Sequence, residues 1–176
     1  LADRIDEQIL AAAAPRCRVF ATCAVGYDNI DLAAAKRLGI TVTNTPDVLT
    51  EATADLAWTL LLAAARRLGE AERFLRAGAW TGWGMLDFLG VDVWGRTLGI
   101  VGAGRIGTAV ARRGTGFGMR ILYHDSEPRP AIDSLGAQRV PLPELLEASD
   151  FISLHTPLVP ETRNLIDAKA IARMKR

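Results

Sequence analysis

The sequence predicts an α/β protein with a doubly wound parallel sheet. Apolar segments of strand length alternate along the chain with segments of helical period, an order that is typical of parallel sheets. One transition from strand to helix reads Gly102-Ala103-Gly104-Arg105-Ile106-Gly107. The strand that follows this helix ends at an acidic residue, Asp125. These features together predict a sheet whose carboxyl edge carries a binding site.

Composition places the chain among globular proteins. Of its 176 residues 49% are hydrophobic and 23% are charged, so a packed core is expected and disorder is not. A net charge of +1 does not indicate binding to nucleic acid or to an anionic membrane. The most apolar run, Leu56–Ala65, is shorter than the roughly 20 residues of a membrane span, and no secretory signal opens the chain. Cys17 and Cys23 have no partners at metal-binding spacing, so we expect buried thiols of a reducing compartment and no metal site.

Two strands and one helix are predicted before residue 47. The strands are short runs rich in apolar or branched residues, and the helix lies between them. Asp28 or Asn29 is expected to cap this helix, and Gly39 to end it. The predicted segments are the strand Arg18–Cys23, the helix Asp31–Leu38 and the strand Ile40–Thr43.

A long helix is predicted over Glu51–Ala77, with Thr50 as its N-cap. Its first half is apolar on most faces, which indicates burial against more than one neighbour. The following segment, Gly78–Val93, is rich in Gly and Trp and has no period. We expect it to be an ordered loop, because its large aromatic side chains need burial. These are Trp80, Trp83 and Phe88.

From residue 97 onward strands and helices alternate clearly. Gly114, Gly116 and Gly118 repeat the spacing of the earlier glycines, but they fall at a helix end, where glycine serves as a C-cap. The predicted strands are Leu98–Val101, Arg120–His124 and Asp150–Leu154, and the predicted helices are Arg105–Arg113, Pro143–Ala148 and Ala168–Met174.

The glycine-rich turn has the context that dinucleotide binding requires, because it follows a strand and opens a helix. Gly102 permits the tight turn, Gly104 lets a pyrophosphate approach the backbone, and Gly107 lets the helix pack closely on the strand. Phosphates then face the N–H groups at the positive end of the helix dipole, with Arg105 and Ile106 in the first turn. The sequence therefore predicts a Rossmann-type cofactor site.

Asp125 follows Gly102 by 23 residues, close to the spacing of about 20 at which such folds place a ribose-binding acid. A carboxylate there accepts hydrogen bonds from the ribose hydroxyls and repels a 2′-phosphate, which favours NAD over NADP. His124 and Ser126 flank this acid and join the predicted cofactor site. NADP stays open as an alternative, because Arg129 lies near enough to Ser126 to bind a 2′-phosphate.

Several motifs resemble one family in their order along the chain. Ala24-Val25-Gly26-Tyr27-Asp28-Asn29-Ile30-Asp31 resembles the substrate loop of D-2-hydroxyacid dehydrogenases. Val42–Pro46 and Ala54–Leu56 resemble the crossing into their nucleotide domain, and His155–Leu158 with Glu161-Thr162 resembles a later cofactor loop. The Trp- and Gly-rich segment before Val93 is most similar to glyoxylate and hydroxypyruvate reductases.

The resemblance implies an oxidoreductase that transfers a hydride between NAD(H) and a small 2-keto or 2-hydroxy acid. It implies that residues 1–46 are the C-terminal remnant of a flavodoxin-like substrate domain, and that residues 47–176 are a Rossmann domain incomplete at its C-terminus. Backbone amides of Val25 and Gly26 would hold the substrate carboxylate. The further cofactor-binding residues that it implies are Thr53, His155, Thr156, Pro157 and Thr162.

The family's catalytic arginine, glutamate and histidine match positions beyond Arg176, so no catalytic residue is assigned and the chain alone is expected to be inactive. The resemblance also implies a cytoplasmic homodimer packed through the helix Glu51–Ala77. Alternatives are an NAD(H)-sensing corepressor of the same fold, or a phosphoglycerate or lactate dehydrogenase. An NAD domain of the adenosylhomocysteine hydrolase type is disfavoured by the loop Val25–Asp31.

Overall fold

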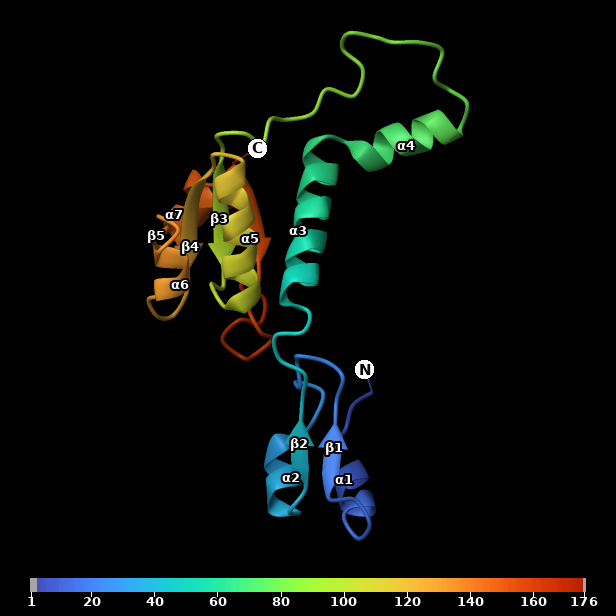
Figure 1. Cartoon of the computed structure of the whole chain (residues 1–176), viewed down its shortest axis with the longest axis vertical. Coiled ribbons are helices and arrows are strands. Elements are labelled where there is room, and N and C mark those ends of the chain that lie inside the picture. The colour runs from blue at the N-terminus through green and yellow to red at the C-terminus, as the bar shows by residue number, and fades with distance from the viewer. Residues whose placement is uncertain (1–2, 176) are drawn as a thin grey trace. The chain divides into compact units, whose positions relative to one another are not determined.

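The computed structural model describes residues 3–175, which form two compact units (Figure 1). Unit 1 comprises residues 1–49 and 157–163, and unit 2 comprises residues 50–156 and 164–176, apart from the residues outside the described range. Among residues 3–175, no helix is long and apolar enough to cross a lipid bilayer.

Unit 1 is a small parallel α/β unit. Its two strands pair in parallel, with Val19 opposite Thr41. Asp31 caps the second helix, since its carboxylate accepts the N–H of Ala34 at 2.8 Å, so the predicted caps Asp28 and Asn29 are wrong. The elements are α1 Glu7–Ala13, β1 Val19–Ala21, α2 Leu32–Arg37 and β2 Thr41–Thr43. Their buried core contains Leu10, Ala34, Ala35 and Ile40.

Unit 2 contains a four-stranded parallel sheet in the order β5-β4-β3-β6. Val101 lies opposite both His124 and Leu154, so three strands end at one carboxyl edge. From β3 the chain proceeds to β4 and β5 on one side and returns to β6 on the other, which makes the sheet doubly wound. The strands are β3 Thr97–Val101, β4 Arg120–His124, β5 Gln138–Arg139 and β6 Phe151–Leu154.

Helices cover both faces of this sheet, as Figure 1 shows for α5 and α7. Leu98, Ile100 and Tyr123 belong to one buried cluster, whereas Val101 and Leu122 belong to the other, as the alternation of strand side chains requires. The first face is covered by α3 Thr50–Ala65, α5 Arg105–Gly116 and α6 Pro130–Asp133, and the second by α7 Leu142–Ala148 and α8 Ala168–Arg173.

Trp58 joins α3 to α5. Its indole N–H donates to the carbonyl of Val110 at 2.9 Å, and its ring stacks on Phe117 with centroids 4.7 Å apart. The Arg113 guanidinium on α5 also pairs with the Asp55 carboxylate on α3 at 2.5 Å. A buried aromatic anchor with its polar atom bonded explains why α3 holds its place against α5.

The predicted helix over Glu51–Ala77 is wrong in its continuity. It breaks at Arg67, whose φ of +53° is left-handed, and the chain resumes as α4 Leu68–Arg76. The break is stabilised from outside the helix, because the N–H of Val91 donates to the carbonyl of Ala65 at 2.9 Å. Thr50 is the first helical residue and not a flanking cap.

Three expectations about burial and glycines also need correction. Trp80 and Trp83 are 58% and 81% exposed, so the aromatic side chains of the loop are not all buried. Cys23 is exposed and Cys17 is half-buried, so the thiols are not core residues. Of the three later glycines, only Gly118 lies just beyond the helix with a left-handed φ of +61°, whereas the other two lie inside α5.

Replacing Tyr123 with Phe should lower the free energy of unfolding by about 1–2 kcal/mol. The buried hydroxyl donates to the Asp133 carboxylate at 2.7 Å and accepts the N–H of Arg129 at 3.2 Å, and both groups would lose a partner. Urea unfolding followed by circular dichroism measures the change. The chain's other tyrosine, Tyr27, is half exposed, so Tyr27→Phe serves as a control that should leave stability unchanged. Equal stability of both variants would contradict this account.

Candidate functional site

The turn between β3 and α5 lies at the carboxyl edge of the unit 2 sheet. Gly102 has a φ of +90°, a conformation that L side chains rarely adopt. A Cβ on it would lie 2.8 Å from the carbonyl carbon and oxygen of His155, so the ends of β3 and β6 meet closely here. The N–H of Gly102 donates to the carbonyl of His124 at 2.9 Å, which attaches the turn to β4 as well.

The other two glycines of the motif have different surroundings. A Cβ on Gly107 would lie 2.1 Å from the carbonyl oxygen of Gly102, so this glycine lets α5 pack against the turn. A Cβ on Gly104 would meet no atom within 4 Å. Gly104 therefore borders open space, as a position that a ligand approaches must.

The N-terminus of α5 faces the same edge. Gly104 is its N-cap and provides no side-chain bond to the first turn. The first bond within the helix runs from the N–H of Thr108 to the carbonyl of Gly104 at 2.9 Å. The N–H groups of the first helical turn carry the positive end of the helix dipole, which suits an anion. Arg105 is exposed at this end, while Ile106 is half-buried against the core.

Asp125 follows β4 and is 9% exposed. Its Oδ2 accepts the N–H of Ala103 at 2.9 Å, and its Oδ1 accepts from the Arg129 guanidinium at 3.0 Å. The hydroxyl of Ser126 and the N–H of Glu127 lie 3.3 and 3.4 Å from the same Oδ1. The predicted acid is thus bonded directly to the glycine turn.

The charge state of Asp125 follows from these contacts. Burial alone raises the pKa of a carboxyl, but the hydrogen bonds from Arg129 and from the N–H of Ala103 outweigh burial and hold the pKa of Asp125 below its ordinary value. The group is an anion at neutral pH. Its Oδ2 accepts the N–H of Ala103, and a carboxylate oxygen has about two lone-pair sites, so Oδ2 retains capacity for a ligand hydroxyl group.

Both histidine rings are bonded within unit 2. His124 Nδ1 lies 3.2 Å from the carbonyl oxygen of Val140, and His155 Nε2 lies 2.8 Å from the hydroxyl of Ser153. Burial lowers the pKa of His155, so its ring is neutral at pH 7. His155 also lines a cavity of about 510 Å³ between α3 and β6, which Thr53 lines from the helix.

The remaining predicted cofactor residues follow β6. The methyl group of Thr156 lies 2.9 Å from the position of a Cβ on Gly102, so Thr156 borders the turn. Pro157 and Thr162 belong to unit 1. The Thr162 hydroxyl donates to the carbonyl of Pro157 at 2.5 Å and accepts the N–H of Val159 at 3.0 Å, which closes their loop locally.

The predicted substrate loop lies in unit 1, after β1. The Asn44 side chain donates to the carbonyl of Val25 at 2.9 Å and fixes the loop to the end of β2. A Cβ on Gly26 would lie 3.2 Å from the carboxylate of Asp28, a tight contact that glycine avoids. Val25 and Gly26 thus belong to unit 1, whereas the glycine turn and Asp125 belong to unit 2.

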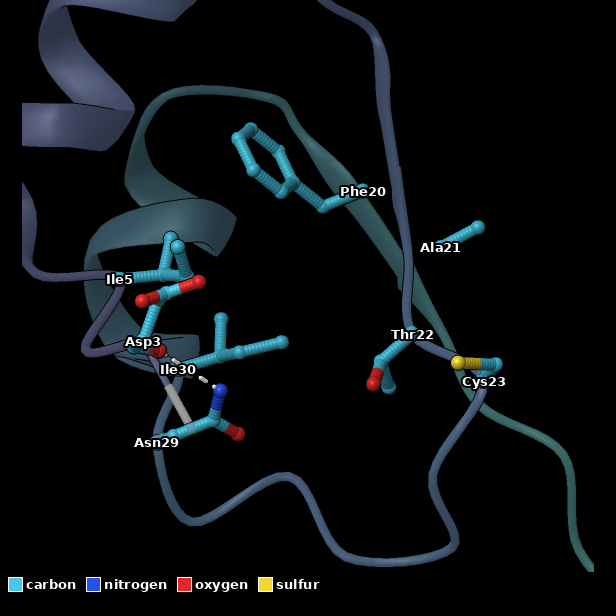
Figure 2. Close-up of a pocket in the computed structure, with 8 residues that line it drawn as sticks. All are labelled: Asp3, Ile5, Phe20, Ala21, Thr22, Cys23, Asn29 and Ile30. Atoms are coloured by element: carbon cyan, nitrogen blue, oxygen red, sulfur yellow. Dashed lines mark hydrogen bonds between the residues drawn. The ribbon is translucent and has the colours of Figure 1, made fainter. Parts of the chain in front are cut away.

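A separate pocket of about 270 Å³ lies in unit 1 beside β1 (Figure 2). The side chains of Ile5, Phe20 and Ile30 line it, and the Asn29 amide donates to the carbonyl of Asp3 at 2.9 Å. Among the described residues that line it, only Asp3 has a charged side chain, and its carboxylate would repel an organic acid. Neither Val25 nor Gly26 lines this pocket, so we do not assign it to the candidate site.

Two contacts of the site were not predicted from the sequence. The N–H of Ala103 binds Asp125, although alanine carries no signal for such a role. The Arg139 guanidinium on β5 donates to the carbonyls of Asp125 and Ser126 at 3.0 and 2.8 Å, and so closes the loop after β4. β5 has two residues, too few to be recognised from hydrophobic periodicity. Nothing in the sequence therefore indicated that Arg139 lies on a strand beside Asp125.

Comparison with known proteins gives consistent matches. The family described as "D-isomer specific 2-hydroxyacid dehydrogenase, NAD binding domain" matches residues 58–176. Glyoxylate reductase of Korarchaeum cryptofilum is 57% identical over 100% of this chain and 53% of its own length. The TT0316 protein of Thermus thermophilus superposes with a TM-score of 0.93 at 49% identity, covering 99% of this chain and 54% of that one.

A ligand-bound relative matches as well. D-lactate dehydrogenase of Aquifex aeolicus, solved in complex with NAD and lactic acid, has a TM-score of 0.88 at 34% identity and covers 98% of this chain and 51% of that one. The chain therefore spans about half the length of the relatives it matches.

Gly107→Ala should lower the free energy of unfolding by about 1–3 kcal/mol, since its Cβ collides with a backbone carbonyl and forces a shift. Gly104→Ala is the matched variant, because its Cβ enters open space and should leave stability nearly unchanged. Urea unfolding of both proteins measures the difference. A Gly107→Ala protein as stable as Gly104→Ala would show that the turn is not packed as described.

Proposed function

Since the chain belongs to the D-isomer specific 2-hydroxyacid dehydrogenase family, we propose that it forms the NAD-binding part of an enzyme that reduces a small 2-keto acid. The observation that carries this proposal is the bond between the N–H of Ala103 and the Asp125 carboxylate. It brings an anion-binding turn and a sugar-binding acid to the same edge of one sheet.

The described residues fit NAD. The open space beside Gly104 and the N-terminus of α5 suit the cofactor's diphosphate, and the anionic Asp125 suits the hydroxyls of the adenosine ribose. When bound, NADH supplies the hydride that reduces the keto group. The residues of this chain bind and orient the cofactor, and an anionic Asp125 disfavours the extra phosphate of NADP.

We propose that unit 1 belongs to the substrate domain. Its parallel strands suit the remnant of a flavodoxin-like domain expected over residues 1–46, with the nucleotide domain over 47–176. The first segment of unit 1 ends at Leu49, and residues 157–163 also belong to this unit. The amides of Val25 and Gly26 would bind the substrate carboxylate. The acid–base groups that the resemblance implies match positions beyond Arg176, so we assign neither His124 nor His155 to that role.

Glyoxylate or hydroxypyruvate is the substrate that we propose. The curated relatives at 57% and 54% identity, from Korarchaeum cryptofilum and Thermococcus onnurineus, are named glyoxylate reductases. We also propose a cytoplasmic location, which suits the two free cysteines of a reducing compartment.

We further propose that the enzyme is a homodimer that packs through α4 and the loop after it. This segment exposes many large apolar side chains, which is unusual for a monomer surface. A cavity of about 380 Å³ lies between its two parts, lined by Ala71, Phe74, Leu75, Trp80 and Phe88. Its most exposed apolar residues include Leu75, Trp83, Met85 and Leu86.

The cofactor proposal is tested with the full-length protein, by titrating NADH against the unsubstituted enzyme and Gly104→Val. The branched side chain fills the space that the diphosphate needs, so the Kd for NADH should rise by at least about a hundredfold, or 2.7 kcal/mol. Steady-state reduction of glyoxylate should fall in parallel. Unchanged NADH binding in a folded Gly104→Val protein would refute the proposed site. Binding of NADH without turnover of any 2-keto acid would refute the enzyme assignment.

The dimer proposal is tested by sedimentation of the full-length protein carrying Trp83→Asp and Leu86→Asp together. Charges at the centre of an apolar interface should convert the dimer to a monomer at micromolar concentration. Val48→Asp is the matched control, since Val48 is 83% exposed but lies in unit 1. A dimer that survives the double substitution would place the interface elsewhere.

A further inference from the structure

The main chain at the end of β4 changes its source of hydrogen bonds where the strand ends. The carbonyls of the last two residues of β4 each accept a backbone N–H at 2.9 Å, one from Val140 and the other from Gly102. β5 ends at Arg139, so the ladder between β4 and β5 does not extend to Asp125. The next two carbonyls, of Asp125 and Ser126, therefore need donors from a side chain or from water.

The side chain of Arg139 provides these donors. Its Nη2 donates to the carbonyl of Asp125 at 3.0 Å and to that of Ser126 at 2.8 Å, and its Nε lies 3.3 Å from the former oxygen. The Cα of Arg139 is paired with Tyr123 in the sheet, so the side chain extends from a fixed point toward the loop. A guanidinium presents its donors in a planar fork, which can bind two neighbouring carbonyls at once. Arg139 thus continues the hydrogen bonding of the sheet past the end of β5.

These bonds also set the direction of the loop's N–H groups. The peptide groups after Asp125 and Ser126 are trans, so each N–H points away from the carbonyl that Arg139 binds. The N–H of Glu127 lies 3.4 Å from Asp125 Oδ1. Asp125 is therefore held twice, through its main chain by Arg139 and through its carboxylate by the N–H of Ala103 at 2.9 Å. A carboxylate that is fixed before a ligand arrives binds a hydroxyl without the cost of ordering the loop.

We propose that Arg139 is a positioning residue of the adenosine end of the cofactor site, where it fixes the main chain from which the Asp125 carboxylate meets the ribose hydroxyls. The inference rests on the proposed function and deepens it. Arg139 acts through Asp125 and needs no contact with the cofactor. Its loss should weaken the binding of NADH and leave the reaction at the nicotinamide unchanged.

The first test is steady-state reduction of glyoxylate by the full-length protein carrying Arg139→Met, which removes the guanidinium and keeps an unbranched stem. The KM for NADH should rise by on the order of tenfold, or 1.4 kcal/mol, because NADH must then order the loop. The kcat at saturating NADH and the KM for glyoxylate should stay unchanged. Arg139→Lys should raise the KM for NADH less, since an ammonium keeps the charge but has no planar fork.

Arg120→Met is the matched control. Arg120 is also exposed, and its guanidinium donates to the Gln138 side chain at 3.0 Å, which joins the same two strands at the start of β4. The substitution removes the same charge and a bond between the same strands, but it leaves the loop after β4 untouched. The KM for NADH should therefore stay unchanged. A rise equal to that of Arg139→Met would assign the effect to net charge or to β5, and would refute the positioning role.

A comparison of two ligands tests whether Arg139 acts through the ribose. ADP and 2′,3′-dideoxy-ADP compete with NADH for the site, and only ADP has the hydroxyls that the Asp125 carboxylate would bind. Arg139→Met should weaken ADP by on the order of tenfold and the dideoxy compound much less. An equal loss for both ligands would mean that Arg139 contacts the diphosphate or supports the fold in general, and would overturn the proposal.

The remaining outcomes separate this proposal from the proposed function. NADH binding by the unsubstituted protein, with an unchanged KM for NADH in a folded Arg139→Met variant, would overturn the positioning role alone. If Arg139→Met does not fold, Arg139→Lys replaces it, and an unchanged KM for NADH in that variant would have the same meaning. Failure of the unsubstituted protein to bind NADH would overturn the proposed function and the positioning role together.

Discussion

The hydrogen bond from the N–H of Ala103 to the Asp125 carboxylate is the contact on which the candidate site depends. It joins the turn after β3 to the end of β4, and neither segment can easily adopt another conformation. The turn passes through a left-handed Gly102 packed against His155, and Asp125 is almost fully buried. A buried carboxylate without donors would destabilise the fold, so the same group that suits a sugar also stabilises the turn that suits a diphosphate.

The centre of the nucleotide site could be predicted because its determinants are local in sequence. The strand expected over Leu98–Val101 is β3 extended by one residue, and the strand over Arg120–His124 is β4 as predicted. Helix α5 begins at Arg105 as expected and continues to Gly116. A strand, a glycine turn, a helix and an acid follow one another within 30 residues, so no distant contact was needed to find them.

The larger errors concern segments whose conformation depends on contacts distant in the sequence. Arg67 adopts a left-handed conformation where the chain around Phe88 and Val91 contacts the end of α3. The helical periodicity of the sequence does not indicate these contacts. The aromatic loop was expected to be ordered through burial, but Trp83 remains exposed. The elements α6 and β5 have four and two residues, too few to be predicted from hydrophobic periodicity.

Asp125 could be predicted from local sequence, but the charged group beside it could not, because that group is positioned by distant contacts. Asp125 was recognised by its distance from Gly102, but the meaning of its charge depends on the cation beside it. That cation is placed by α6, and α6 is attached to the sheet by the hydroxyl of Tyr123 inside the core. A ligand that approaches this pair meets a negative and a positive charge together. Its binding free energy therefore contains an attraction and a repulsion that oppose each other. The charge that a ligand meets at this edge is therefore set by a four-residue helix as well as by the acid that its spacing predicted.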